Sequence, residues 1–174
     1  MTHTTKLVFG PLACLVAVLA LGAGVPASAQ AGCAKSGEPV RSISKKNARA
    51  AIGCLFNKER TAANVKRNGD VETAAQRHSG VMASKYCYSH QCPGEPDLKE
   101  RIARTGYLRG ASGFELGEVI HRLVDNASPR QIVREWMNSP PHGDAIRKSS
   151  YDHVGIGISI RGGLVFATGD LARR

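Results

Sequence analysis

Apolar residues recur at helical spacing in residues 42–65, the first long patterned segment of the chain. Ile52 and Phe56 lie four positions apart, and alanines continue the same stripe on both sides. Ser44 precedes the stripe and is a residue type that caps helix N-termini. The polar run at residues 66–70 interrupts the pattern, so the sequence predicts one helix between Ser44 and this run.

Two further helices are predicted in the central part of the chain. Residues 71–85 carry a second apolar stripe, and because His78 lies on it, we expect this histidine to be a hydrogen-bonded core residue rather than a ligand. Residues 97–108 predict a short helix that Asp97 caps and Gly106 ends. The stripe of the longer helix consists of Val71, Ala74, Ala75, His78 and Met82.

A fourth helix is predicted in residues 126–141. Ser128 is its expected N-cap, and Pro129 occupies the first helical position, where a missing N–H costs nothing. Trp136 lies on the apolar face of this helix. We expect Pro140 to stop the helix.

The pattern changes to short apolar runs at the C-terminal end of the chain. Residues 153–160 and 164–171 are rich in β-branched and small residues, and Gly162 and Gly163 separate them. This arrangement predicts a β-hairpin. Helices followed by a terminal hairpin indicate an α+β fold built in layers.

The N-terminal segment has the pattern of a secretory signal. Lys6 precedes an uncharged apolar run at residues 12–24, and the small residues Ala27 and Ala29 flank an expected cut before Gln30. A retained membrane anchor is the alternative, since the uncharged stretch is long enough to span a bilayer. We expect cleavage and a soluble, exported protein. The predicted organisation is a signal peptide (1–29), a polar tail (30–43) and one domain (44–174).

Four of the five cysteines lie beyond the predicted signal. An even number of cysteines in an exported chain predicts disulfide bonds. The short spacing of Cys87 and Cys92 favours a local clasp, which leaves Cys33 to pair with Cys54. A zinc site is the competing interpretation, but the usual C-x2-C spacing is absent.

The chain is strongly basic, with a formal net charge of +10. The charge is spread along the sequence, which suits a solvated surface or attraction to an anionic envelope polymer. No helix-turn-helix, zinc-finger or aromatic RNA-binding signature is present, so we expect no nucleic-acid partner.

An ordered set of motifs resembles the CAP superfamily, the group of cysteine-rich secretory, antigen 5 and pathogenesis-related proteins, whose domain is also called SCP. The resemblance runs from about Cys54 to the C-terminus and includes "CLFNKERTAANV", "AAQRHSGVM", "YSHQC", "RIARTGYL", "LGEVI", "SPRQIVREWMNSPPH" and "HVGIGI". It implies an α-β-α sandwich, in which a small antiparallel sheet of three strands lies between helical layers. It also implies a groove lined by two histidines and two acidic residues.

The resemblance places the groove residues on specific positions of this chain. His90 in "YSHQC" and His142 in "SPPH" match the two histidines, and Glu118 in "LGEVI" matches one acidic residue. The prolines before His142 are expected to turn the chain so that it reaches the groove. Ser139 stands where eukaryotic members have the second acidic residue. Glu135, one helical turn earlier, is our hypothesis for its replacement.

Two further departures from the family pattern concern residues next to the predicted groove. Val119 replaces the asparagine of the usual GEN motif, and Pro141 replaces a small glycine before the second histidine. We expect both changes to alter the polarity of the groove rather than the core.

Histidine and glutamate side chains are ligand types that suit zinc or another divalent cation. A site formed by His90, His142 and Glu118, supplied from separate loops, would leave open positions for an acidic bound water, which is the basis of a hydrolase hypothesis. The alternative is a hydrogen-bonded groove without metal. Ser139 is not expected to be a nucleophile, because no G-x-S-x-G elbow is present.

Two functions remain open from the sequence. The first is a secreted, monomeric, non-catalytic binding module for an extracellular lipid, cell-wall polymer or protein. The second is a metal-assisted hydrolase that uses the histidine and glutamate groove. A mainly structural envelope protein is a third alternative, since a fold alone does not define function.

Overall fold

The computed structural model describes Met1 and residues 32–174. The predicted signal peptide at residues 1–29 lies, apart from Met1, outside the described residues. Within the described part of the chain, no helix combines the length and the apolar character needed to cross a membrane.

The described chain contains five α-helices, one 3-10 turn and four strands. Three strands are long and antiparallel, and a two-residue strand adds to them in parallel, giving the order β1-β3-β4-β2. The helical elements are η1 (Val40–Ser42), α1 (Lys45–Glu59), α2 (Gly69–Lys85), α3 (Leu98–Ala103), α4 (Pro129–Asn138) and α5 (Pro140–Arg147). The strands are β1 (Lys66–Arg67), β2 (Glu115–Val124), β3 (His153–Arg161) and β4 (Leu164–Arg173).

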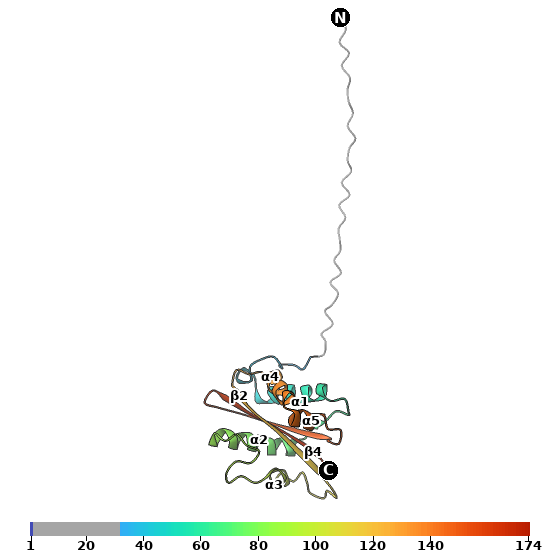
Figure 1. The fold of residues 1–174 in the computed structure, drawn as a ribbon, viewed down its shortest axis with the longest axis vertical. Coiled ribbons are helices and arrows are strands. Elements are labelled where there is room, and N and C mark those ends of the chain that lie inside the picture. The colour runs from blue at the N-terminus through green and yellow to red at the C-terminus, as the bar shows by residue number, and fades with distance from the viewer. Residues whose placement is uncertain (2–31) are drawn as a thin grey trace. The chain divides into compact units, whose positions relative to one another are not determined.

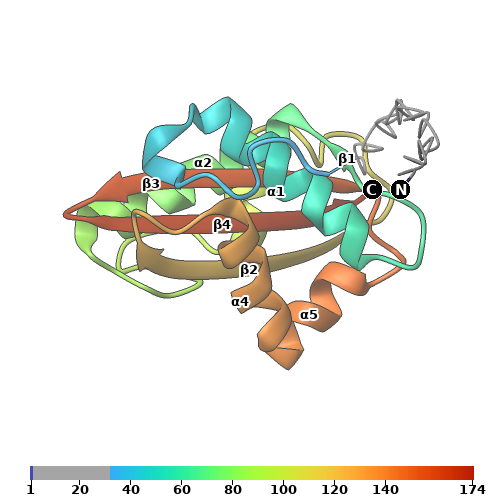
Figure 2. The same ribbon diagram turned by 90° about the horizontal axis from the view of Figure 1, so that it is seen from above.

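The sheet lies between two helical layers. Helices α1, α4 and α5 cover one face, and α2 and α3 cover the other (Figures 1 and 2). The structure therefore confirms the predicted α+β fold and α-β-α sandwich. Strand β2 is at one edge of the sheet, which leaves its outer side available for a groove.

Local sequence signals place the ends of the helices. The side chains of Ser44, Asp97 and Ser128 each accept a hydrogen bond from a backbone N–H in the first turn of the helix that follows. Ser128 forms a capping box with Gln131, whose side chain accepts from the Ser128 N–H at 2.8 Å. These three predicted N-caps are confirmed.

Helix α4 ends at Asn138, two residues before Pro140, so the predicted stop is confirmed. The sequence analysis did not predict that Pro140 also begins a second helix, α5. The physical reason is that proline has no N–H and a fixed φ, and both properties suit the first position of a helix. Ser139, with φ −96° and ψ 110°, is the single extended residue between α4 and α5.

Two glycines in β3 allow α2 to pack directly on the sheet. A Cβ atom at Gly155 would lie 2.2 Å from the backbone of Val71, and one at Gly157 would lie 2.1 Å from the carbonyl oxygen of Ala75. Any larger residue would push the helix away. Ser79 of α2 also binds this face of the sheet, because its hydroxyl donates a hydrogen bond to the Thr168 hydroxyl of β4 at 2.8 Å.

The opposite face of the sheet packs against α1 and α4. The rings of Phe56 and Trp136 meet edge to face, with centroids 5.5 Å apart, and both side chains are fully buried. Val119 belongs to this same core. The expectation that Val119 alters the groove is therefore wrong, because alternation along β2 turns Val119 away from the face that carries Glu118.

Both predicted disulfides are present. Cys33 pairs with Cys54 and ties the N-terminal tail to α1. Cys87 pairs with Cys92 and closes the loop that follows α2. The second bond fixes the loop that carries His90, so it links a covalent constraint directly to the candidate site.

Candidate functional site

Glu118 is the centre of the candidate site. It lies on the edge strand β2, and its side chain is only 3% exposed. His90 donates from Nδ1 to Glu118 Oε1 at 2.7 Å, and Arg101 donates to Oε2. Both carboxylate oxygens are therefore engaged by protein groups.

Arg101 holds several parts of the groove in place by hydrogen bonds. Its guanidinium also donates to the carbonyl oxygens of His90 at 2.9 Å and Pro96 at 3.2 Å. The Arg101 side chain is 4% exposed, so this is a buried, charge-assisted pair with Glu118. Arg101, a single side chain of α3, thus fixes both the loop that carries His90 and the Glu118 carboxylate that binds the His90 ring.

His142 lies beside His90 in the groove. Their ring centroids are 5.9 Å apart, with planes inclined at 59°. Burial lowers the pKa of His142, and the neighbouring imidazoles of His90 and His121 lower it further, while the Glu118 carboxylate opposes them. His142 is therefore more strongly neutral near pH 7 than an exposed histidine.

The structural origin of the groove residues differs from the prediction of separate loops. His90 lies on a loop, but Glu118 is part of β2 and His142 is in the first turn of α5. The prolines before His142 act by starting this helix. Two of the three groups are thus held on regular backbone, which positions them more rigidly than loops would.

A cavity of about 290 Å³ opens beside His90 and Glu118. Gln91, Asp97 and Leu98 complete its lining. His90 is 55% exposed in its side chain, so one edge of the imidazole faces this space while Nδ1 holds Glu118. Four of the five lining residues are polar or charged in type, but most of the surface that they and Leu98 present to the cavity is apolar.

Asp170 lies directly opposite Glu118 in the β2–β4 register and is completely buried. Neither carboxyl oxygen of Asp170 has a hydrogen-bond partner among residues 32–174 outside this pair. Burial raises the pKa of Asp170 well above its usual value, and the negative charge of Glu118 raises it further. Asp170 is therefore the member of the pair that keeps its proton more readily.

Glu118 is the ionised member. Burial favours its neutral form, but the hydrogen bond from His90 and the charges on His78 and Arg101 outweigh burial and lower the pKa of Glu118. The two pKa values thus shift in opposite directions, because Glu118 accepts hydrogen bonds from His90 and Arg101, whereas Arg101 only partly offsets the burial of Asp170.

His78 is buried in the core, as its position on the apolar stripe predicts. Its Nδ1 lies 2.9 Å from both carboxylate oxygens of Glu95. Its Nε2 lies 3.8 Å from Glu118 Oε2 and has no hydrogen-bond partner in the described chain. His78 therefore borders the groove carboxylate from inside the molecule.

Glu135 lies on α4 and is partly exposed. Its carboxylate is 3.6 Å from the guanidinium of Arg134. Burial lowers the pKa of His121 on β2, and the charge of Glu135 opposes this effect, which places Glu135 within electrostatic reach of that histidine. The hypothesis that Glu135 replaces the missing groove carboxylate remains a prediction.

The sequence analysis did not identify Glu95, Arg101, His121 and Asp170 as part of this region. Arg101 binds Glu118 directly, Asp170 faces it across the sheet, and Glu95 binds His78, which borders it. No local motif marks such pairings. A charged residue inside the apolar run of β4 was the one signal available for Asp170, because acidic residues are rarely buried without a specific reason.

The residues of the groove do not form a ready metal site. Within residues 32–174, no group of three or more histidine, cysteine, aspartate or glutamate side chains is arranged to hold a metal ion. Arg101 and His90 already occupy the oxygens of Glu118. The side chains of His90, His142 and Glu118 are therefore not arranged as a preformed zinc site, and metal binding by them stays a hypothesis.

Comparison with known proteins identifies the family. The family model described as CAP, cysteine-rich secretory protein family, matches residues 48–170. The chain therefore belongs to the CAP family. A comparison with curated protein sequences gives no match.

Solved structures share this fold. An extracellular protein of Bacillus anthracis that contains an SCP domain is 20% identical with a TM-score of 0.63, over 76% of this chain and 44% of the other. An outer surface protein of Borrelia burgdorferi is 14% identical with a TM-score of 0.64, over 76% and 96%. A cysteine-rich secretory protein of Staphylococcus aureus is 15% identical with a TM-score of 0.53, over 74% and 39%. This chain thus spans less than half of the Bacillus and Staphylococcus proteins.

Proposed function

We propose that this CAP protein is an exported, non-catalytic binding module whose groove along β2 recognises an extracellular ligand. The observation that carries the proposal is the state of Glu118. Its carboxylate is buried, and each of its oxygens accepts a hydrogen bond, one from Arg101 and one from His90, which supports a role in holding the groove together rather than in general-base or metal chemistry.

The lining of the groove combines mostly apolar surface with a few hydrogen-bonding groups. His90, Gln91 and Asp97 supply the polar atoms, and Leu98 is the apolar residue of the lining. Such a lining suits a ligand that makes both apolar contacts and hydrogen bonds, as a cell-wall polymer or a protein surface can.

Export is supported by independent features. Two disulfides suit an oxidising compartment. The N-terminal pattern is that of a secretory signal. The similar proteins of Bacillus anthracis and Borrelia burgdorferi are described as extracellular and outer surface proteins.

Co-sedimentation with insoluble peptidoglycan tests the proposal. The disulfide-intact protein lacking residues 1–29 should bind saturably, and His90→Ala should weaken that binding. The variant should remain folded, with a modestly lower melting temperature, because Arg101 still holds the buried Glu118 carboxylate after the hydrogen bond from His90 is lost. Binding should persist in the presence of a chelator. Loss of binding on chelation, or hydrolysis of the polymer that chelation stops, would favour the metal-assisted hydrolase instead.

A further inference from the structure

A cavity forms where the C-terminal end of β4 meets the loop between α3 and β2. Glu115, the first residue of β2, pairs with Arg173, the last residue of β4, so Arg174 lies beside the loop that precedes Glu115. The volume of this cavity is about 350 Å³, which is within the range of small-molecule sites. We call it the Arg109–Arg174 cavity, and its lining residues are Arg109, Gly110, Ala111, Ser112 and Arg174.

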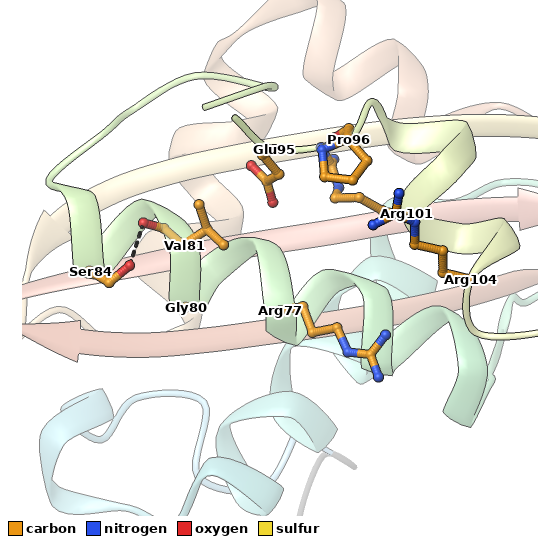
Figure 3. Close-up of a pocket in the computed structure, with 8 residues that line it drawn as sticks. All are labelled: Arg77, Gly80, Val81, Ser84, Glu95, Pro96, Arg101 and Arg104. Carbon is orange, nitrogen blue, oxygen red and sulfur yellow. Dashed lines mark hydrogen bonds between the residues drawn. The ribbon is translucent and has the colours of Figure 1, made fainter. Parts of the chain in front are cut away.

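The lining of the Arg109–Arg174 cavity is polar and cationic. A cavity between α2 and α3, shown in Figure 3, has a mostly apolar surface, and its buried guanidinium, Arg101, is already paired with Glu118. In contrast, most of the surface of the Arg109–Arg174 cavity is polar, and its lining includes two guanidinium groups and no acidic side chain. Such a lining suits an anion better than an apolar ligand.

Arg174 is held in position by contacts within the protein. Its Nη1 donates to the carbonyl oxygen of Tyr107 at 2.7 Å, and its guanidinium lies 5.1 Å from the centroid of the Tyr107 ring. Tyr107 is fully buried, so it is a fixed support for the guanidinium. The hydrogen bond to Tyr107 uses one N–H group, which leaves the other donors of Arg174 for a ligand. Because the side chain is already ordered, a ligand would bind with a smaller loss of conformational entropy.

Neither arginine of this cavity is neutralised by an acidic group among residues 32–174. The acidic side chain closest to the loop in sequence, Glu115, pairs instead with Lys148 and Arg173. The side chain of Arg109 is exposed. Two cations that line one cavity repel each other, and an anion bound between them would replace this repulsion by attraction.

The loop adds neutral hydrogen-bond donors to the two cations. The N–H of Ala111 donates to the carbonyl oxygen of Leu108 at 3.2 Å, but the N–H groups of Gly110 and Ser112 donate to no acceptor in the described chain. Gly110 has a φ of 73°, and a Cβ atom at this position would meet nothing within 4 Å, so the space beside the loop is open. The hydroxyl of Ser112 is a further donor.

From these features we propose that the Arg109–Arg174 cavity binds a phosphate group, either as free inorganic phosphate or as the monoester of a small molecule. A single guanidinium can bind both oxygens of a carboxylate, whereas two guanidinium groups and the loop donors match the additional oxygens and the higher charge of phosphate. The cavity shares no lining residue with the His90 cavity, so the proposal does not depend on the function proposed for the groove.

Calorimetric titration of inorganic phosphate into the disulfide-intact protein lacking residues 1–29 tests the site. The ionic strength is kept constant, so that screening of surface charges is the same in every titration. Phosphate should bind with one-to-one stoichiometry, and acetate should bind at least about tenfold more weakly, because it has only two oxygens and a single charge. The amide resonances of Gly110 and Ser112 should shift when phosphate is added.

Arg109→Gln is the informative variant, because the side chain of Arg109 is exposed and its loss should leave the melting temperature unchanged. This variant should weaken phosphate binding about tenfold or more. Arg41→Gln is the matched control. It removes an equal charge from an exposed position on η1, whose backbone binds Asp125 beyond the other end of β2, and it should leave binding unchanged.

Glycerol 3-phosphate distinguishes the two sources of the phosphate group. Tighter binding of glycerol 3-phosphate than of inorganic phosphate would support the proposal with a phosphate monoester as the ligand. Equal or weaker binding would support it with free phosphate. Absence of saturable phosphate binding, or equal affinities of Arg109→Gln and Arg41→Gln, would overturn the proposal. Amide shifts confined to the residues around His90 would also overturn it.

Discussion

Glu118 and Asp170 face each other across neighbouring strands β2 and β4, and their surroundings shift their pKa values in opposite directions. Arg101 and His90 stabilise the Glu118 carboxylate and lower its pKa, whereas burial and the neighbouring charge of Glu118 raise the pKa of Asp170. This arrangement favours the negative charge on Glu118, at the edge of the groove, over one on Asp170 in the interior.

Removing the charge of Glu118 should destabilise the fold. In Glu118→Gln, the buried guanidinium of Arg101 loses its counter-charge, and we expect the free energy of unfolding to fall by about 3 kcal/mol in urea titrations at pH 7. Glu100→Gln is the matched control, because its pair with Arg104 is more than half exposed and should contribute less than about 1 kcal/mol. Equal effects of the two substitutions would contradict the account of a buried pair.

Asp170→Asn should change how stability depends on pH. The folded pKa of Asp170 is raised, so its contribution is fully present below the unfolded pKa of about 4 and is lost as pH rises through the folded pKa. Asparagine is neutral at every pH and has no such loss. The stability difference should therefore move in favour of Asp170→Asn between pH 4 and pH 7, by about 1.4 kcal/mol for each unit that the pKa is raised.

Urea unfolding of Asp170→Asn and wild type at several pH values in this range measures that difference. A difference that stays constant with pH would show that Asp170 titrates alike in the folded and unfolded chains. Asp170 would then not be the carboxyl group that keeps its proton more readily in its pair with Glu118.

The pKa of His142 should report the presence of His90. NMR titration should place the pKa of His142 below that of an exposed histidine, because burial and the neighbouring imidazoles disfavour its charged form. His90→Ala removes one of those imidazoles and should raise the pKa of His142. An unchanged or lower pKa in the variant would show that the two rings do not interact.

Sequence signals that act locally gave correct predictions of the fold. Ser44, Asp97 and Ser128 cap helices because a capping side chain needs only the backbone of the next turn. Pro140 follows the end of α4 as predicted, but the start of α5 at the same residue was missed, because proline suits both the stop of one helix and the first position of another. The short strand β1 has no apolar pattern of its own and forms only through pairing with β3.

The groove was predicted less completely than the fold. Motif resemblance located His90, Glu118 and His142, of which the structure brings His90 into contact with Glu118 and beside His142. It did not reveal Arg101 or Asp170. These residues meet Glu118 only through tertiary packing and sheet register, which a single sequence does not display.

Calorimetric titration of Zn²⁺ into the disulfide-intact protein lacking residues 1–29 tests the central claim most directly. Because Arg101 and His90 occupy the Glu118 carboxylate, we expect no micromolar one-to-one binding that depends on the groove, and the double variant His90→Ala, His142→Ala should behave like wild type. Micromolar one-to-one binding that the double variant loses would contradict the account. It would make the groove a metal site and the hydrolase the better explanation.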